Sequence, residues 1–177
     1  MNRPGPLVNG TLLVFLFAGS LWAYPALPEQ IPRHFGPYGQ ADAYGATTLL
    51  RWMLLPIVAV FSGAILYGSG WLIRRAPEGI NVPNQAQYEQ LSDEDKRALA
   101  ARAQRATYWM GAPLLVVFGA VQVGTYHVAT TPATALPTAV MTTMGGGILL
   151  ILGIAVGLTW WMHRRVRALA EADDPTS

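Results

Sequence analysis

Side chains that could bind or react gather in one short segment, residues 27–45, which reads LPEQIPRHFGPYGQADAYG. The segment is polar and lies between two long apolar runs. Its guanidinium, imidazole and carboxylate groups can hold a peptide, a lipid headgroup or a protein partner through charge-assisted hydrogen bonds. We therefore expect the ligand- or partner-binding residues to be Arg33, His34, Asp42 and Tyr44.

The backbone of this segment is unsuited to a helix. Its prolines remove backbone donors and disfavour helix at the residues before them. Its glycines permit positive φ angles, which suit a chain that turns repeatedly. The sequence therefore predicts an ordered, irregular loop over residues 27–45. The residues expected to shape this loop are Pro28, Pro32, Gly39 and Gly45.

A metal site is the sharpest alternative for the same side chains. His34 and His127, with Glu29 or Asp42, would supply a His/His/carboxylate ligand set. No pair at metal-ligand spacing such as H-x-x-x-H occurs, so hydrogen bonding within the loop is the favoured interpretation. No metal and no cofactor are predicted. The chain has no cysteine and no nucleophile or nucleotide signature, so we predict no catalytic residue and no enzyme activity.

Four apolar runs frame the segment. Apolar side chains make up 52% of the 177 residues and charged ones only 12%, about half the usual 25%. A helix needs about 20 mostly apolar residues to cross a membrane. The runs of that length cover about residues 7–27, 49–73, 107–129 and 136–162. They predict an all-α integral membrane protein, a single domain over residues 1–177 with a bundle of four transmembrane helices.

The first run has one alternative interpretation, a cleaved signal peptide. Only Arg3 precedes its apolar part, and Pro25 crowds any cleavage site, so retention as a helix is favoured.

The basic residues predict an orientation, because lysine and arginine favour the cytoplasmic side. One side of the predicted topology holds only Arg33 and Arg51. The other holds Arg3, Arg74, Arg75, Lys96, Arg97, Arg102, Arg105, Arg164, Arg165 and Arg167. We therefore expect both termini in the cytoplasm and residues 27–45 on the outer face of a bacterial inner membrane. The net charge of +2 is too small to suggest nucleic acid.

The inner connection, residues 74–106, has two parts. Asn81 to Asn84 read as a turn. Ser92, three residues before Asp95, resembles a capping box that begins a helix. We expect an inner amphipathic helix there, either on anionic headgroups or as a solvated extension of the third span.

Small residues recur in the second and fourth spans, where they let membrane helices pack closely. Packing within the monomer is favoured over packing against a partner. The helix-packing residues expected are Gly63, Gly68, Gly70, Gly145 and Gly157. No ionisable residue lies at the centre of a span, which argues against an ion-coupled transporter.

The pattern of Leu27, Pro28, Ile31, Pro32, His34, Phe35, Gly39, Asp42, Tyr44 and Gly45, with GINVPN at residues 79–84, resembles the signature of a bacterial membrane family. That family is described as a domain of unknown function, and the domain also forms the N-terminal part of SdpI-like immunity proteins. The resemblance implies the four-span topology and an outer motif. Toxin immunity belongs to longer relatives.

Three functions follow, in order of preference. The first is a non-enzymatic membrane protein whose outer loop binds a peptide, a lipid headgroup or a protein partner. The second is an accessory or scaffold subunit of a larger membrane complex, respiratory or photosynthetic, packed through its glycine faces. The third is a small transporter.

Overall fold

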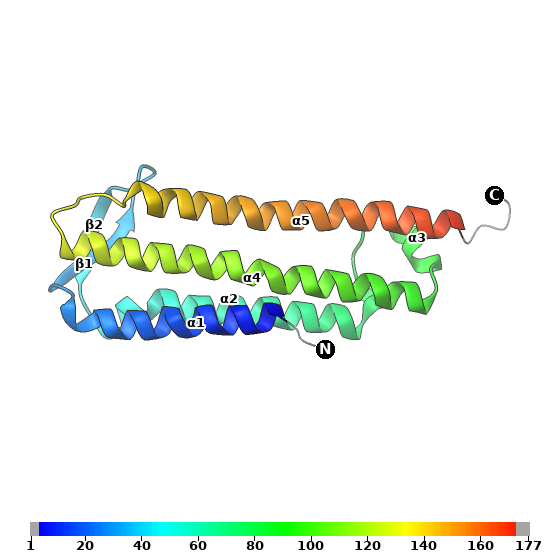
Figure 1. Cartoon of the computed structure of the whole chain (residues 1–177), viewed down its shortest axis with the longest axis horizontal. Coiled ribbons are helices and arrows are strands. Elements are labelled where there is room, and N and C mark those ends of the chain that lie inside the picture. The colour runs from blue at the N-terminus through cyan, green and yellow to red at the C-terminus, as the bar shows by residue number, and fades with distance from the viewer. Residues whose placement is uncertain (1–3, 173–177) are drawn as a thin grey trace. The chain divides into compact units, whose positions relative to one another are not determined.

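Four long helices dominate the computed structural model, which describes residues 4–172 (Figure 1). They are α1 (Pro4–Ala23), α2 (Leu49–Arg75), α4 (Asp93–Thr130) and α5 (Thr138–Ala172). Each is long and apolar enough to cross a membrane. A backbone in lipid must satisfy its own hydrogen bonds, which a helix does within one segment. The chain is therefore a multi-pass helical membrane protein, as its apolar runs predict.

Helix ends differ from the predicted spans where local chemistry intervenes. The first span ends at Ala23 and passes into a single 3-10 turn, Tyr24–Ala26, at Pro25. The third and fourth spans extend well beyond the apolar runs, back to Asp93 and on to Ala172. Residues 93–106 are the first part of α4 and not a separate amphipathic helix, because their alanines and arginines favour helix up to the apolar run. The extension of the third span is thus the arrangement observed.

The start of α4 has the predicted cap. The Ser92 hydroxyl oxygen accepts the Asp95 backbone N–H at 3.2 Å, and the hydroxyl donates to the Asp95 carboxylate at 2.6 Å. Asp93, Glu94 and Asp95 occupy the first turn, where negative charge is favourable. This start was predictable because a cap depends only on neighbours in sequence.

The described residues divide into two compact units. The first comprises residues 4–63 and 111–150, and the second residues 64–110 and 151–172. The long helices α2, α4 and α5 each contribute one part to each unit.

Trp52 organises the core of the first unit. Its side chain is 3% exposed and packs with Ala23, Ile31 and Met53. Its indole N–H donates to the Ser20 carbonyl at 2.7 Å, and its own carbonyl accepts the Gln122 amide at 3.2 Å. One residue of α2 is therefore hydrogen-bonded to both α1 and α4.

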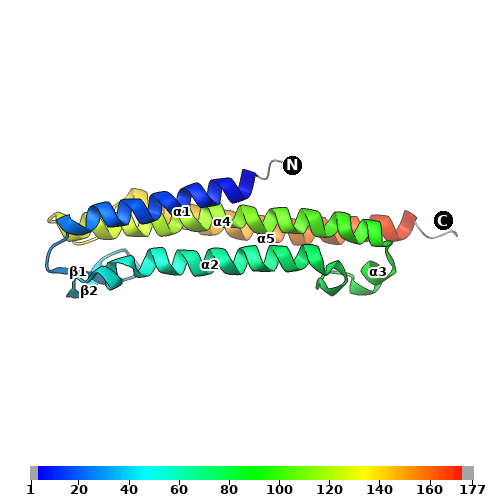
Figure 2. The same ribbon diagram turned by 90° about the horizontal axis from the view of Figure 1, so that it is seen from below.

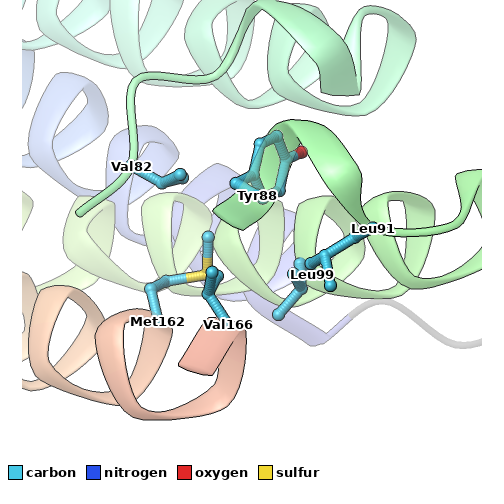
Figure 3. Packing of buried hydrophobic residues seen from close by; sticks show 6 residues of the cluster. All are labelled: Val82, Tyr88, Leu91, Leu99, Met162 and Val166. Atoms are coloured by element: carbon cyan, nitrogen blue, oxygen red, sulfur yellow. The ribbon is translucent and has the colours of Figure 1, made fainter. Parts of the chain in front are cut away.

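Tyr88 is the buried aromatic residue that organises the core of the second unit. It lies on α3 (Gln85–Gln90), which follows Asn84 in the left-handed conformation (φ 63°) within the predicted turn. Tyr88 is completely buried, and its hydroxyl donates to the Pro77 carbonyl at 2.6 Å. Pro77 belongs to a short 3-10 helix, Pro77–Gly79. Figure 3 shows the cluster in which the α2–α4 connection meets α4 and α5: Val82, Tyr88, Leu91, Leu99, Met162 and Val166.

Three helix-packing glycines lie at positions other than those expected. A Cβ atom on Gly111 would overlap the Asn9 amide, and one on Gly147 would overlap Val117. A Cβ atom on Gly124 would lie 2.6 Å from Leu136. These close approaches join segments far apart in sequence, so spacing within one helix does not reveal them.

Of the five glycines expected to pack helices, Gly70 is closely packed. A Cβ atom there would lie 2.5 Å from a Tyr108 ring carbon. At the other four positions, a Cβ atom would meet no atom of the described residues within 4 Å: Gly63, Gly68, Gly145 and Gly157.

Alkaline pH should selectively destabilise the second unit through Tyr88. Burial raises the pKa of the Tyr88 hydroxyl above its ordinary value of 10.0, and the Glu78 carboxylate adds to this rise. The unfolded chain releases this proton near pH 10, whereas the folded chain keeps it to higher pH. The contribution of Tyr88 to the free energy of unfolding is therefore fully present below about pH 10 and is lost as the pH rises above it. We expect thermal stability to fall more steeply above about pH 10 in the wild type than in Tyr88→Phe. Parallel pH profiles of melting temperature for the two proteins would contradict this expectation.

Candidate functional site

The segment expected to be an irregular loop is a β-hairpin. Strand β1 (Gln30–Phe35) pairs antiparallel with β2 (Ala41–Ala46), in a register that sets Ile31 opposite Gly45 and Pro32 opposite Tyr44. An irregularity follows Pro32, which has no N–H for the ladder. The fold is thus mostly helical rather than all-α.

The hairpin turn explains why the segment can form strands despite its prolines. Pro37 and Gly39 lie where a tight turn prefers proline and glycine, and the Gly39 N–H donates to the Gly36 carbonyl at 2.9 Å. Gly39 has φ 78°, and a Cβ there would come within 3.1 Å of the Met141 sulfur. Both the conformation and the space require glycine. Ile31, Phe35 and Tyr44 are residues that favour strands, and their place on either side of such a turn was the available signal for a hairpin.

The hairpin is anchored at its base and along its edge. At its base the Thr47 hydroxyl donates to the Pro28 carbonyl at 2.6 Å, and the Thr47 N–H donates to the Glu29 carbonyl at 2.8 Å. At its edge the Ala41 N–H donates to the Thr134 carbonyl at 3.0 Å, in the connection between α4 and α5. Figures 1 and 2 show the strands beside this connection and the start of α2. These bonds close the base of the hairpin and attach its edge to the α4–α5 connection.

The four expected binding residues separate into two groups. His34 Nδ1 lies 2.7 Å from Asp42 Oδ1, and the two side chains are 68% and 50% exposed. Tyr44 is also exposed. Arg33 takes no part in this pair, because its side chain lies across Gly45, where a Cβ atom would overlap it. The missing side chain at Gly45 thus leaves the space that Arg33 occupies.

Arg33 lies in a cavity of about 400 Å³ together with Arg51. The Arg51 guanidinium donates to the Ala46 carbonyl, and its backbone N–H donates to the capping Thr48 hydroxyl at 3.2 Å. Among the residues lining the cavity none is acidic: Ile31, Pro32, Arg33, Phe35, Arg51, Trp52, Leu54, Leu55, Val58, Val121, Gln122 and Thr125. The sequence places Arg51 at a helix end, but only the structure shows that it lines the same cavity as Arg33.

A third metal ligand does not join the His34–Asp42 pair. Within residues 4–172, no three histidine, aspartate or glutamate side chains come together in a group that could hold a metal ion. The pair is therefore arranged for hydrogen bonding at the surface.

Four membrane-length helices with a hairpin between the first two define the class of this chain, a multi-pass membrane protein. Residues 11–60, which contain most of α1, the hairpin and the start of α2, match the family described as "Domain of unknown function (DUF1648)". The match confirms the resemblance read from the motif.

A protein of Archaeoglobus fulgidus named "Uncharacterized protein" is 33% identical to this chain over 99 residues, which cover 51% of this chain and 48% of the relative. The chain thus spans about half the length of that curated relative. No solved structure matches the chain.

Proposed function

We propose that the protein is a non-enzymatic binding protein of a bacterial inner membrane, with the hairpin on the outer face and both termini in the cytoplasm. The distribution of basic residues supports this orientation. Arg74 and Arg75 end α2, and Arg164 and Arg165 lie near the end of α5, whereas among residues 4–172 the basic residues of the hairpin and the start of α2 are only Arg33 and Arg51. Positive charge favours the cytoplasmic side of a membrane.

The exposed His34–Asp42 pair on an anchored hairpin carries the proposal that this face recognises a ligand or partner. An exposed ion pair contributes no more than about 1 kcal/mol to stability. The hairpin is already held by Thr47 and the α4–α5 connection. The pair is therefore available for recognition, and Tyr44 of the same hairpin is also an exposed aromatic side chain.

The test uses the full chain in its native membranes. We expect His34→Ala and Asp42→Ala to accumulate as the wild type does but to lose specific cross-links formed at the hairpin, because each removes one half of the recognition pair. Tyr38→Ala is the control, since Tyr38 is 82% exposed on the same hairpin but is not among the proposed contacts. The readout is mass spectrometry of cross-linked material together with the amount of protein in the membrane.

Two results would overturn this function. Loss of accumulation in both variants would show that the pair is structural. Cross-links identical to those of wild type would show that the pair does not recognise a partner.

A second candidate, an accessory subunit of a larger membrane complex, is favoured by the exposure of α5. Only 6% of the most apolar stretch of that helix is buried, compared with 33% for α4. Gly145 and Gly157 leave room beside α5 for another helix. Stoichiometric co-purification with a large complex, unaffected by His34→Ala, would support this candidate in place of the first.

A further inference from the structure

We propose that the cavity under the hairpin binds the phosphate group of an anionic amphiphile, with the phosphate at Arg33 and Arg51 and the apolar chain along α2. This inference rests on the proposed function, because it adds a second binding site to the same outer-face hairpin. Its site is distinct from the exposed His34–Asp42 pair, so the two can be tested separately.

The charge of the cavity selects an anion. Arg33 and Arg51 contribute two guanidinium groups, and no acidic side chain lines the cavity. Asp42, the carboxylate of β2, is already paired with His34 at 2.7 Å. Guanidinium groups bind phosphate oxygens through two parallel hydrogen bonds.

Arg33 has its hydrogen-bonding capacity available for a ligand. Among the described residues, its guanidinium makes no hydrogen bond and no ion pair. Arg51, by contrast, is oriented by its bond to the Ala46 carbonyl and by its place in the first turn of α2. Its guanidinium is thus fixed where Arg51 lines the cavity, while Arg33 remains free to close on an anion.

The shape of the cavity indicates that the phosphate carries an apolar chain. Arg51, Leu54, Leu55 and Val58 follow one another at helical spacing on one face of α2, and all four line the cavity. This stripe places charge at one end and about 10 Å of apolar surface beyond it. Leu54 and Val58 are 56% and 40% exposed, so the apolar part opens toward the surroundings of the helix. A lipid has the same division into anionic head and apolar chain.

Gly45 leaves the space in which the Arg33 side chain lies. A Cβ atom at this position would overlap Cδ of Arg33, so a larger residue would displace the Arg33 side chain from the position it occupies. Gly45→Ala is therefore expected to weaken phosphate binding although Arg33 itself is not substituted.

The experiment measures lipid binding to the full-length protein, purified in a mild detergent, by native mass spectrometry. The probes are phosphatidylglycerol, phosphatidylcholine with the same acyl chains, and inorganic phosphate. We expect wild type to bind phosphatidylglycerol in preference to phosphatidylcholine, with Arg33→Gln and Arg51→Gln each weakening that binding by about tenfold or more. Arg33→Lys should retain part of the preference because it keeps the charge but loses the two-pronged geometry.

Controls separate this site from general attraction of lipids to arginine. Arg75→Gln, at the other end of α2, should bind phosphatidylglycerol as wild type does. Tyr38→Ala should also bind normally, since Tyr38 is 82% exposed on the same hairpin and does not line the cavity. Circular dichroism of each variant confirms that it is folded.

The proposal is overturned by equal binding of the two lipids, by wild-type binding in the double variant Arg33→Gln/Arg51→Gln, or by an equal loss in Arg75→Gln. Displacement of phosphatidylglycerol by inorganic phosphate would assign the site to a free anion and overturn the amphiphile. None of these lipid-binding results would change the outcome of the His34–Asp42 cross-linking experiment. The two proposals can therefore be overturned independently of each other.

Discussion

Replacement of Trp52 by alanine is expected to lower the free energy of unfolding by about 3–5 kcal/mol, the usual loss for a buried aromatic side chain. Trp52 is 3% exposed and fills the space between Ile31 of the hairpin and Tyr126 of α4. The substitution leaves a cavity and removes the hydrogen bond from the indole to the Ser20 carbonyl. Both effects loosen the contact of α2 with α1 and α4, and the hairpin loses its apolar support.

Two variants isolate these effects in thermal unfolding followed by circular dichroism in a mild detergent. Trp52→Phe keeps most of the ring but has no N–H, so its expected loss is only about 1–2 kcal/mol. Trp22→Ala is the matched control, because Trp22 is 82% exposed. A Trp52→Ala protein that melts together with Trp22→Ala would contradict the assigned role.

Tyr88→Ala is expected to cause a loss of similar size, about 3–5 kcal/mol, in the second unit. The ring is completely buried among Val82, Leu99 and Val166, and the hydroxyl satisfies the Pro77 carbonyl. Without it, the connection between α2 and α4 loses the side chain that packs it against α4 and α5. Limited proteolysis should therefore show faster cleavage within residues 76–92.

The control for Tyr88 is Tyr38→Ala, since Tyr38 is 82% exposed on the hairpin. This variant should be cleaved within residues 76–92 at the wild-type rate. Unchanged protection of that segment in Tyr88→Ala would show that α3 is held by other contacts and that the prediction is wrong.

Membrane class and helix positions were predictable because they depend on properties local to the chain. A run of about 20 apolar residues must become a helix in lipid, whatever its neighbours are. The cap at Ser92 and the turn at Asn84 are likewise decided within a few residues. The hairpin also depends on local sequence and could have been predicted. The three prolines and three glycines in residues 27–45 instead favoured the interpretation as an irregular loop. The tight turn at Pro37 and Gly39 lets the segments on either side of it pair as antiparallel strands.

The candidate site depended instead on which distant residues meet. His34 and Asp42 were both expected to bind, yet only the strand register brings their side chains to 2.7 Å and directs Arg33 away from them. Arg51 joined the site because β1 packs over the first turns of α2, a contact that no spacing within either element encodes.

The glycines follow the same division. Their frequency in the spans predicts close packing somewhere, but not where, because every glycine in a helix offers the same small surface. The partners at Gly111, Gly124 and Gly147 come from other helices or connections. Hydropathy and capping act along the chain and so determine its elements. Packing and charge pairing act across space, and only the tertiary structure decides them.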